Sequence, residues 1–183
     1  MASLYYLISS LPMLILGEKR PITNEEFMIN CSDFLSPNQY KEIQDISLVP
    51  STDSKSKISV VEKWKNWEIN LRNHLVKNRA IILKKDSFSF LKEERNYFSE
   101  SERGAQEALS ADNPRTKEMV LDKIRWKEID NLECGHHFDI PRLALYKLRL
   151  LLCSKWLERI EKQGSANIDS ALSTLYKNND DEN

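Results

Sequence analysis

The sequence predicts a single-domain, mainly α-helical protein built as a bundle of about six to eight helices. Its 183 residues include only four glycines and six prolines, which is few for a β protein that turns about every 8–12 residues. Its 27 basic and 28 acidic residues are balanced, as expected for amphipathic helices with solvated faces. A chain of this length buries roughly 70% of its unfolded surface, so one core without disulfides or metals is sufficient.

The N-terminal part of the chain is predicted to contain an apolar element followed by a capped helix. Residues 4–16 fit either a short buried helix that ends near Pro12 or a buried strand, because an apolar run alone does not distinguish the two. Thr23 and Glu26 have the spacing of a capping box, which predicts a helix over about 24–35.

A second capping box and a polar linker follow. Ser36 and Gln39 repeat the same spacing, with Pro37 at the first helical position, so a helix is expected to continue to about residue 46. The segment 49–58 is rich in Ser, Lys and turn-forming residues, and it predicts a flexible linker within the single domain.

Residues 59–84 are predicted to form one long helix. Apolar residues recur there at alternating spacings of four and three, which is typical of a helix that packs lengthwise against others. At 1.5 Å per residue, this helix would be roughly 39 Å long. The seam residues are Val60, Trp64, Trp67, Leu71 and Leu75, and the charged residues Lys65, Glu68, Arg72 and Arg79 fall mainly off the seam.

The next part of the chain is predicted to contain two helices separated by a proline. Residues 85–97 mix aromatic and basic residues and predict no defined element. A helix begins at Ser99 or Ser101 and ends near residue 111. Pro114 then occupies the first position of a long helix over 114–134.

Two further helices are predicted after Gly135, which ends the preceding helix as a left-handed cap. Asp139 caps a third long helix over 140–162, and a last helix ends near residue 177. The single domain therefore spans 1–177, and the polar residues 178–183 are expected to form a disordered tail.

The cysteines and the apolar runs predict a cytoplasmic protein. Cys31, Cys134 and Cys153 are far apart, and in a reducing compartment they are most simply small core residues. The apolar runs 4–16 and 143–157 are too short or too charged to span a bilayer, which takes about 20 apolar residues. Membrane contact is therefore expected only through a partner.

The segment 133–139 is the strongest candidate for metal chemistry, because Cys134, His136, His137 and Asp139 are residue types that bind zinc. A structural zinc site needs four ligands, usually from two separate pairs, and the sequence contains only this one group. The favoured alternative is a helix C-cap, a tight turn and the next N-cap. No metal or other cofactor is therefore expected.

No catalytic site is predicted, so the chain is not expected to be an enzyme. A Cys134 nucleophile would need a base and an oxyanion hole within reach, which adjacency to histidine does not supply. Four isolated glycines cannot form a phosphate-binding loop, so direct nucleotide binding is not expected either.

A nucleic-acid surface is a further alternative for the region between Lys77 and Tyr97. Its basic residues alternate with Phe88 and Phe90, as in proteins that stack single strands on aromatic rings. The net charge of −1 favours a solvated helix end and loop instead, so no nucleic-acid partner is expected.

Several segments, taken in their order along the chain, resemble the bacterial protein family that is encoded in V-type ATPase operons. They cover most of the chain except 41–57, 84–97 and the tail. The matching segments run from Tyr5 to Leu14, Pro21 to Phe27, Trp67 to Leu75 with Arg79 and Ala80, Ala108 to Pro114, Arg125 to Asp139, and Leu145 to Trp156.

The resemblance implies a non-catalytic accessory subunit, because this family is thought to stand in for the V-type ATPase C-subunit. That C-subunit is the all-helical socket between the central stalk and the membrane ring of this ion- and proton-transporting machine. The implied partners are stalk and ring proteins of the ATPase, and the implied location is peripheral to the inner membrane. The chain is much shorter than a typical C-subunit, so at most part of that body is present. The alternative is a free-standing helical adaptor that binds another protein or nucleic acid.

The residues expected at a partner interface follow from their chemistry and not from the family. Helix-end residues supply directional polar groups on an exposed rim, and arginines off the long seam bind carboxylates in bidentate fashion. The alternative is an ordinary solvated face or local salt bridges. Charge reversal at either arginine of the long helix is expected to weaken assembly and leave helicity unchanged. The expected interface residues are Arg72, Arg79, Arg125, Trp126, Asp130, Glu133, His136 and His137.

Overall fold

The computed structural model describes residues 2–49, 51, 55–94 and 96–156. Within these residues the chain forms seven α-helices, one 3₁₀ helix and no strand, which confirms the mainly α prediction. The helices are α1 (Ala2–Ser10), α2 (Asn24–Ser32), α3 (Pro37–Gln44), α4 (Ser59–Leu83), the 3₁₀ helix η1 (Phe88–Phe90), α5 (Ser99–Ser110), α6 (Pro114–Glu133) and a helix over residues 140–156.

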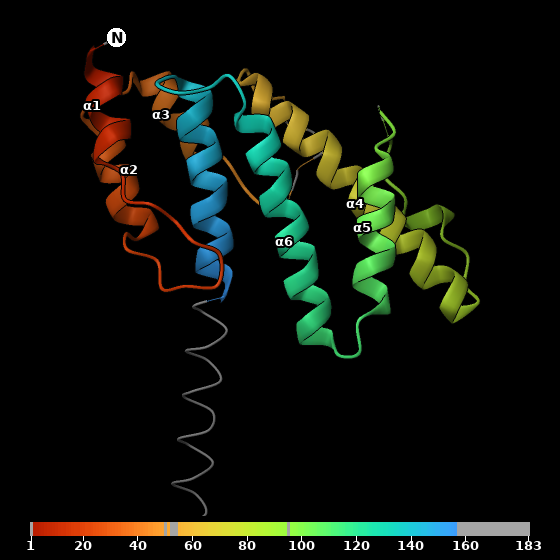
Figure 1. Ribbon diagram of the computed structural model, residues 1–183. Coiled ribbons are helices and arrows are strands. Elements are labelled where there is room, and N and C mark those ends of the chain that lie inside the picture. The colour runs from red at the N-terminus through yellow and green to blue at the C-terminus, as the bar shows by residue number, and fades with distance from the viewer. Residues whose placement is uncertain (1, 50, 52–54, 95, 157–183) are drawn as a thin grey trace, which may run out of the picture.

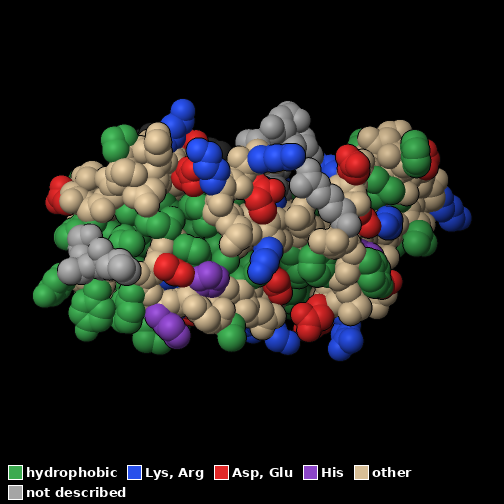
Figure 2. Space-filling view, turned by 90° about the horizontal axis from the view of Figure 1, so that it is seen from above, with side chains coloured by type: hydrophobic (Ala, Val, Ile, Leu, Met, Phe, Trp, Pro, Cys, Tyr) green, Lys and Arg blue, Asp and Glu red, His purple; other side chains and the backbone are tan. Residues whose placement is uncertain are grey.

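The helices form an elongated body with one continuous core (Figures 1 and 2). At one end, α1, α2 and α3 lie around the 140–156 helix, and at the other end α4 crosses behind α5. Helix α6 lies between these two groups and contacts both α4 and α5. The arrangement places the N-terminal helix and the end of α4 at opposite ends of the molecule.

The two capping boxes form as the sequence predicts. The Thr23 hydroxyl accepts the Glu26 N–H at 3.1 Å, and the Glu26 carboxylate accepts the Thr23 N–H at 2.7 Å. Ser36 and Gln39 make the same reciprocal pair at the start of α3. Helix α2 ends at Ser32, three residues earlier than predicted, because the chain must turn before Ser36 adopts the extended conformation of an N-cap.

The ambiguous apolar run is a helix followed by a loop that packs on the 140–156 helix. Helix α1 ends before Pro12, and the Pro12 carbonyl accepts the Tyr146 hydroxyl at 2.8 Å. Further along the loop, Arg20 donates to the Ser154 hydroxyl at 2.6 Å. These contacts fasten the N-terminal segment to residues more than a hundred positions away.

Helix α4 confirms the long-helix prediction, and all five predicted seam residues are buried. The Trp64 and Trp67 rings stack with their centroids 5.5 Å apart, in the middle of the core. Before α4, Ile58 is buried and the Ser56 N–H donates to Glu62 at 2.6 Å, so this end of the predicted 49–58 linker packs against the domain. Residues 50 and 52–54 of the linker lie outside the described residues.

Residues 85–97, for which no element is predicted, are held in place by two buried amide side chains of α4. Asn73 Nδ2 donates to the Lys92 carbonyl at 2.7 Å, and Asn73 Oδ1 accepts the Lys92 N–H at 3.0 Å. Asn70 Nδ2 donates to the Asn96 carbonyl at 3.1 Å, and its oxygen accepts the Ser101 hydroxyl at the start of α5. Side chains of α4 thus provide hydrogen-bond partners for a segment that lacks the regular backbone hydrogen bonds of a helix or strand.

The C-terminal helices begin and end at the predicted signals. Asn113 caps α6, whose first residue is Pro114. Gly135 has a φ of +84°, the left-handed conformation that its role as a helix terminator requires. Asp139 accepts the Arg142 N–H at 3.1 Å and begins the next helix. Its predicted continuation to 162, the last helix to 177 and the tail 178–183 lie outside the described residues.

Two of the three cysteines are core residues, as predicted, whereas Cys134 is exposed. Burial raises the pKa of Cys31 to about 12 and that of Cys153 to about 11, from 9.0. Between pH 9 and 11 the unfolded chain loses these thiol protons while the folded chain keeps them, so alkali favours unfolding. Burial of Lys147 lowers its pKa and has the opposite effect, whereas burial raises the pKa of Tyr146 to about 12 and adds to the effect of the thiols.

We therefore expect the free energy of unfolding to fall by about 1–3 kcal/mol between pH 9 and about pH 10.5. Urea titrations followed by circular dichroism under reducing conditions measure this slope. Replacing Cys153 with valine should flatten the slope, and replacing the exposed Cys134 with alanine should leave it unchanged. A free energy of unfolding that does not change with pH over this range would contradict raised pKa values for the buried thiols.

Candidate partner-binding surfaces

A buried network of charged side chains joins three helices at the centre of the molecule. Glu68 of α4 and Asp122 of α6 are both fully buried. Arg125 donates to both oxygens of Glu68 at 2.9–3.0 Å and to Asp122 at 2.8 Å. Lys155, from the 140–156 helix, donates to Asp122 at 2.8 Å, and Arg72 donates to Glu68 at 2.7 Å. Every one of these charges therefore has an opposite partner.

The network corrects the predicted roles of two residues. Arg125 is predicted on an exposed rim, but it is 8% exposed and faces the interior. Burial by itself lowers the pKa of Arg125, but the Glu68 and Asp122 carboxylates raise it overall, so the guanidinium remains charged. Glu68, placed off the apolar seam by its charge, is fully buried because Arg125 reaches it from α6.

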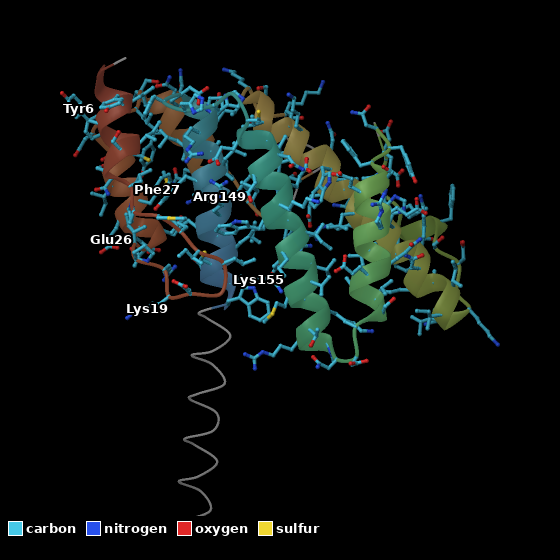
Figure 3. The ribbon with its side chains drawn as sticks, viewed as in Figure 1. Tyr6, Lys19, Glu26, Phe27, Arg149 and Lys155 are labelled. Carbon is cyan, nitrogen blue, oxygen red and sulfur yellow. The ribbon has the colours of Figure 1, made fainter. Side chains whose placement is uncertain are left out.

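A second group of charges lies near the end of α6, where the interface rim is predicted. Arg149 donates to Glu133 at 2.5 Å and to Asp130 at 2.5 Å, and its guanidinium lies 5.5 Å from the centroid of the Trp126 ring. Arg142 also pairs with Glu133. Figure 3 shows Arg149 on the 140–156 helix, which faces α6. Asp130 remains half exposed, so it can also meet a cation on a partner.

This rim borders a hollow of about 470 Å³ between α6, the 140–156 helix and the loop after α1. Its wall combines Met13 and Leu14 with the charged Arg142 and Arg149. The hollow is the concave part of this end of the molecule, where a small apolar side chain of a partner would fit.

The histidine pair lies in the turn between α6 and the next helix. The His136 Nδ1 lies 2.6 Å from the Asp139 carboxylate, so this imidazole contacts the next N-cap and not the terminal carbonyls of α6. His137 is exposed. Across the described ranges, no three His, Cys, Asp or Glu side chains are grouped in a way that could hold a metal ion.

The two arginines of α4 have different environments. Arg72 is tied to Glu68, whereas Arg79 is exposed and forms no ion pair with any described residue. Both line a groove of about 530 Å³ that runs between α4 and α6 past the buried network. Arg79 is therefore the better placed of the two for a carboxylate of a partner.

Charge reversal is expected to affect these two arginines differently. Replacing Arg72 with glutamate sets a second carboxylate beside the buried Glu68, so we expect a loss of at least about 2 kcal/mol of stability. Replacing Arg79 with glutamate should change stability by less than about 0.5 kcal/mol. Urea unfolding of both variants tests the contrast, and equal losses would contradict the structure. We therefore keep the prediction of unchanged helicity for charge reversal at Arg79 and no longer make it for Arg72.

Two groups of exposed apolar side chains lie on elements at opposite ends of the body, on α1 with the turn before residue 140 and at the end of α4 (Figure 1). The first, here called the aromatic patch, comprises the exposed Tyr5, Tyr6 and Phe138. Tyr5 and Phe138 contact each other with ring centroids 4.6 Å apart, which joins the patch to the histidine turn. Figure 3 shows Tyr6 on the outer side of α1.

The second patch is the end of α4 together with η1, here called the α4 tip and defined as residues 81–90. Five large apolar side chains of the α4 tip are exposed. Figure 2 shows apolar and basic side chains together at this end of the molecule. In the sequence, Phe88 and Phe90 are considered only as part of an alternative nucleic-acid surface, and the exposure of the aromatic patch is not predicted, because apolar residues are normally buried.

None of the described helices has the length and apolar character needed to cross a bilayer. No protein-family model, curated protein or solved structure matches this chain, so its function is inferred from the surfaces described above.

Proposed function

We propose that this chain is a non-catalytic accessory component of a V-type ATPase, similar to the C-subunit of that complex. It would couple the central stalk to the membrane ring, or assist their assembly, at the cytoplasmic side of the inner membrane. The observation that supports this role best is the pair of exposed patches at opposite ends of one helical body. A connector between two bodies needs two separate contact surfaces.

The buried charge network supports the mechanical part of the proposal. A connector that transmits force must keep its helices from sliding past one another. Glu68, Asp122 and Arg125 are buried and bonded across α4 and α6, so sliding by one turn would leave charges unpaired in the interior. Lys155 extends the same restraint to the third helix.

The end of the molecule with the aromatic patch is the proposed site for a protein partner. Tyrosine is enriched at interface hot spots, because it combines a large apolar ring with a polar end. His137 is exposed and directly precedes Phe138, so it adds a polar group that fixes orientation. The same surface would equally serve a free-standing adaptor, which is the alternative function.

A native pull-down distinguishes the two functions. The tagged full chain is expressed in its own cells, membranes are solubilised gently, and co-purifying proteins are identified and quantified. Stalk and ring proteins of the ATPase in fixed proportion to the chain are expected. Recovery of unrelated proteins without ATPase components would favour the adaptor, and an active ATPase that purifies without the chain would exclude a coupling role.

A variant of the aromatic patch makes the pull-down specific to this surface. Replacing the exposed Tyr6 with serine should lower ATPase recovery at least about tenfold, the effect of removing one aromatic hot spot. The control replaces Met119, an exposed residue of α6 outside the patch, with serine. Equal recovery from both variants would show that the patch is not the contact surface.

A further inference from the structure

The α4 tip leaves large apolar side chains uncovered at one end of the molecule. Ile81, Ile82, Leu83, Phe88 and Phe90 are between 64% and 80% exposed. Scattered exposed apolar residues are common, but a contiguous group of this kind marks a binding surface. The tip projects away from the shared core (Figure 1), so no described element covers it.

Basic residues surround these apolar side chains. Residues 77–94 contain five basic and three acidic residues, a local net charge of +2 in a chain whose total charge is −1, and Lys77 pairs with Glu94. Among the described residues, Arg79, Lys84 and Lys85 form no ion pair. Their charges are therefore available to an anionic surface.

Several backbone N–H groups of the tip are hydrogen-bonded. The Lys85 N–H donates to the Ala80 carbonyl at 3.0 Å and closes the end of α4. The Phe88 N–H donates to the Asp86 carboxylate at 3.1 Å, and the Phe90 N–H donates within the 3₁₀ turn at 3.0 Å. An apolar medium penalises unpaired N–H groups, so these bonds lower the cost of bringing the segment into one.

Lipid headgroups complement this surface better than a second protein does. The apolar residues project from the body, so a protein partner would need a deep apolar pocket with an acidic rim. A bilayer surface deforms around projecting side chains and supplies both an apolar layer and anionic phosphates.

We propose that the α4 tip docks directly on an anionic phospholipid bilayer. Ile82, Phe88 and Phe90 would enter the interfacial layer, while Lys84 and Lys85 meet the headgroup phosphates. This inference replaces the expectation that the chain contacts a membrane only through a partner. It goes beyond the proposed ATPase function, in which the α4 tip would then meet the lipid at the membrane ring, and it is tested without that function because the isolated chain carries the complete tip.

Flotation of the purified full chain with vesicles tests the proposal. One set of vesicles is pure phosphatidylcholine, and the other contains about one third phosphatidylglycerol. Stronger binding to the anionic set is expected, and it should weaken as salt is raised. Replacing Lys84 and Lys85 with glutamine should lower the partition coefficient about thirtyfold, since each charge at an anionic surface contributes about fivefold.

Matched variants separate the contribution of the tip from general effects. Replacing Phe88 and Phe90 with serine should also lower anionic vesicle binding at least about tenfold. Replacing Met13 and Ile29, exposed apolar residues at the other end, with serine should leave it unchanged. All variants are checked for unaltered circular dichroism.

The outcomes separate this proposal from the ATPase assignment. Vesicle binding that depends on the tip supports the proposal even if the pull-down recovers no ATPase components. Absence of vesicle binding overturns it, and so does equal binding to both lipid compositions or by all variants. Loss of ATPase recovery in tip variants without any vesicle binding would identify the tip as a protein contact instead.

Discussion

Replacing Arg125 with methionine is expected to lower the free energy of unfolding by about 3–5 kcal/mol. The methionine fills most of the arginine volume, so the loss is chiefly electrostatic. Arg125 supplies two hydrogen bonds to Glu68 and one to Asp122, and both carboxylates are fully buried. Without Arg125, the Glu68 and Asp122 carboxylates stay buried with fewer hydrogen-bond donors. Leaving them undersatisfied costs more free energy than the loss of the ion pairs alone.

Urea and thermal unfolding followed by circular dichroism measure this effect. The matched control is Arg72 replaced by methionine. Its side chain is 36% exposed and bonds to only one oxygen of Glu68, so we expect about 1 kcal/mol or less. Replacing Glu68 with glutamine in the Arg125 variant should restore part of the loss, because no unpaired carboxylate then remains at that position. A cost below about 1 kcal/mol for Arg125 would show that the network is solvated.

Replacing Trp64 with alanine is expected to cost about 3–5 kcal/mol. The Trp64 side chain is fully buried, and its ring stacks on Trp67 with an interplanar angle of 28°. Alanine removes both the stacking and most of the volume of a residue at the centre of the core. The surrounding helices cannot close such a cavity without moving α4.

Replacing Trp64 with phenylalanine should cost much less, about 1.5 kcal/mol or below. Within the described residues, the buried Trp64 Nε1 has no hydrogen-bond partner. Phenylalanine removes this unpaired N–H group, and the gain partly offsets the packing lost with the smaller ring. The comparison is Trp156, whose Nε1 donates to Asp122 at 2.9 Å. Phenylalanine at that position should be the more costly of the two in urea unfolding. The reverse order would contradict the hydrogen bonding at one of the indoles.

Local signals in the sequence were sufficient to predict most of the fold. The capping pairs at Thr23 and Ser36 act over three residues, so their geometry follows from spacing alone. The seam of α4 is equally local, because a helical period fixes which side chains share a face. The predicted boundaries consequently differ from the observed ones by only a few residues where the chain is described.

The buried charges could not be predicted in this way. Glu68 and Arg125 are 57 positions apart, and no local pattern indicates that they meet. Taken alone, each charged residue is expected to face solvent. Arg125 lies in the C-terminal half of a helix, so its position in the sequence predicts an exposed interface rim. Asp130 and Glu133 share Arg149 as a partner near the end of α6, and no sequence signal indicated this arginine because it comes from another helix.

The Asn70 and Asn73 contacts of α4 affect which insertions and substitutions the loop after α4 tolerates. The loop after Leu83 begins at the end of α4, and its other end is held because Asn73 bonds to Lys92 and Asn70 to Asn96. The entropy of closing a loop depends only weakly on its length, so insertions or replacements there should leave the rest of the domain intact. The α4 tip is therefore an exchangeable module, in which binding specificity can diverge without a new fold.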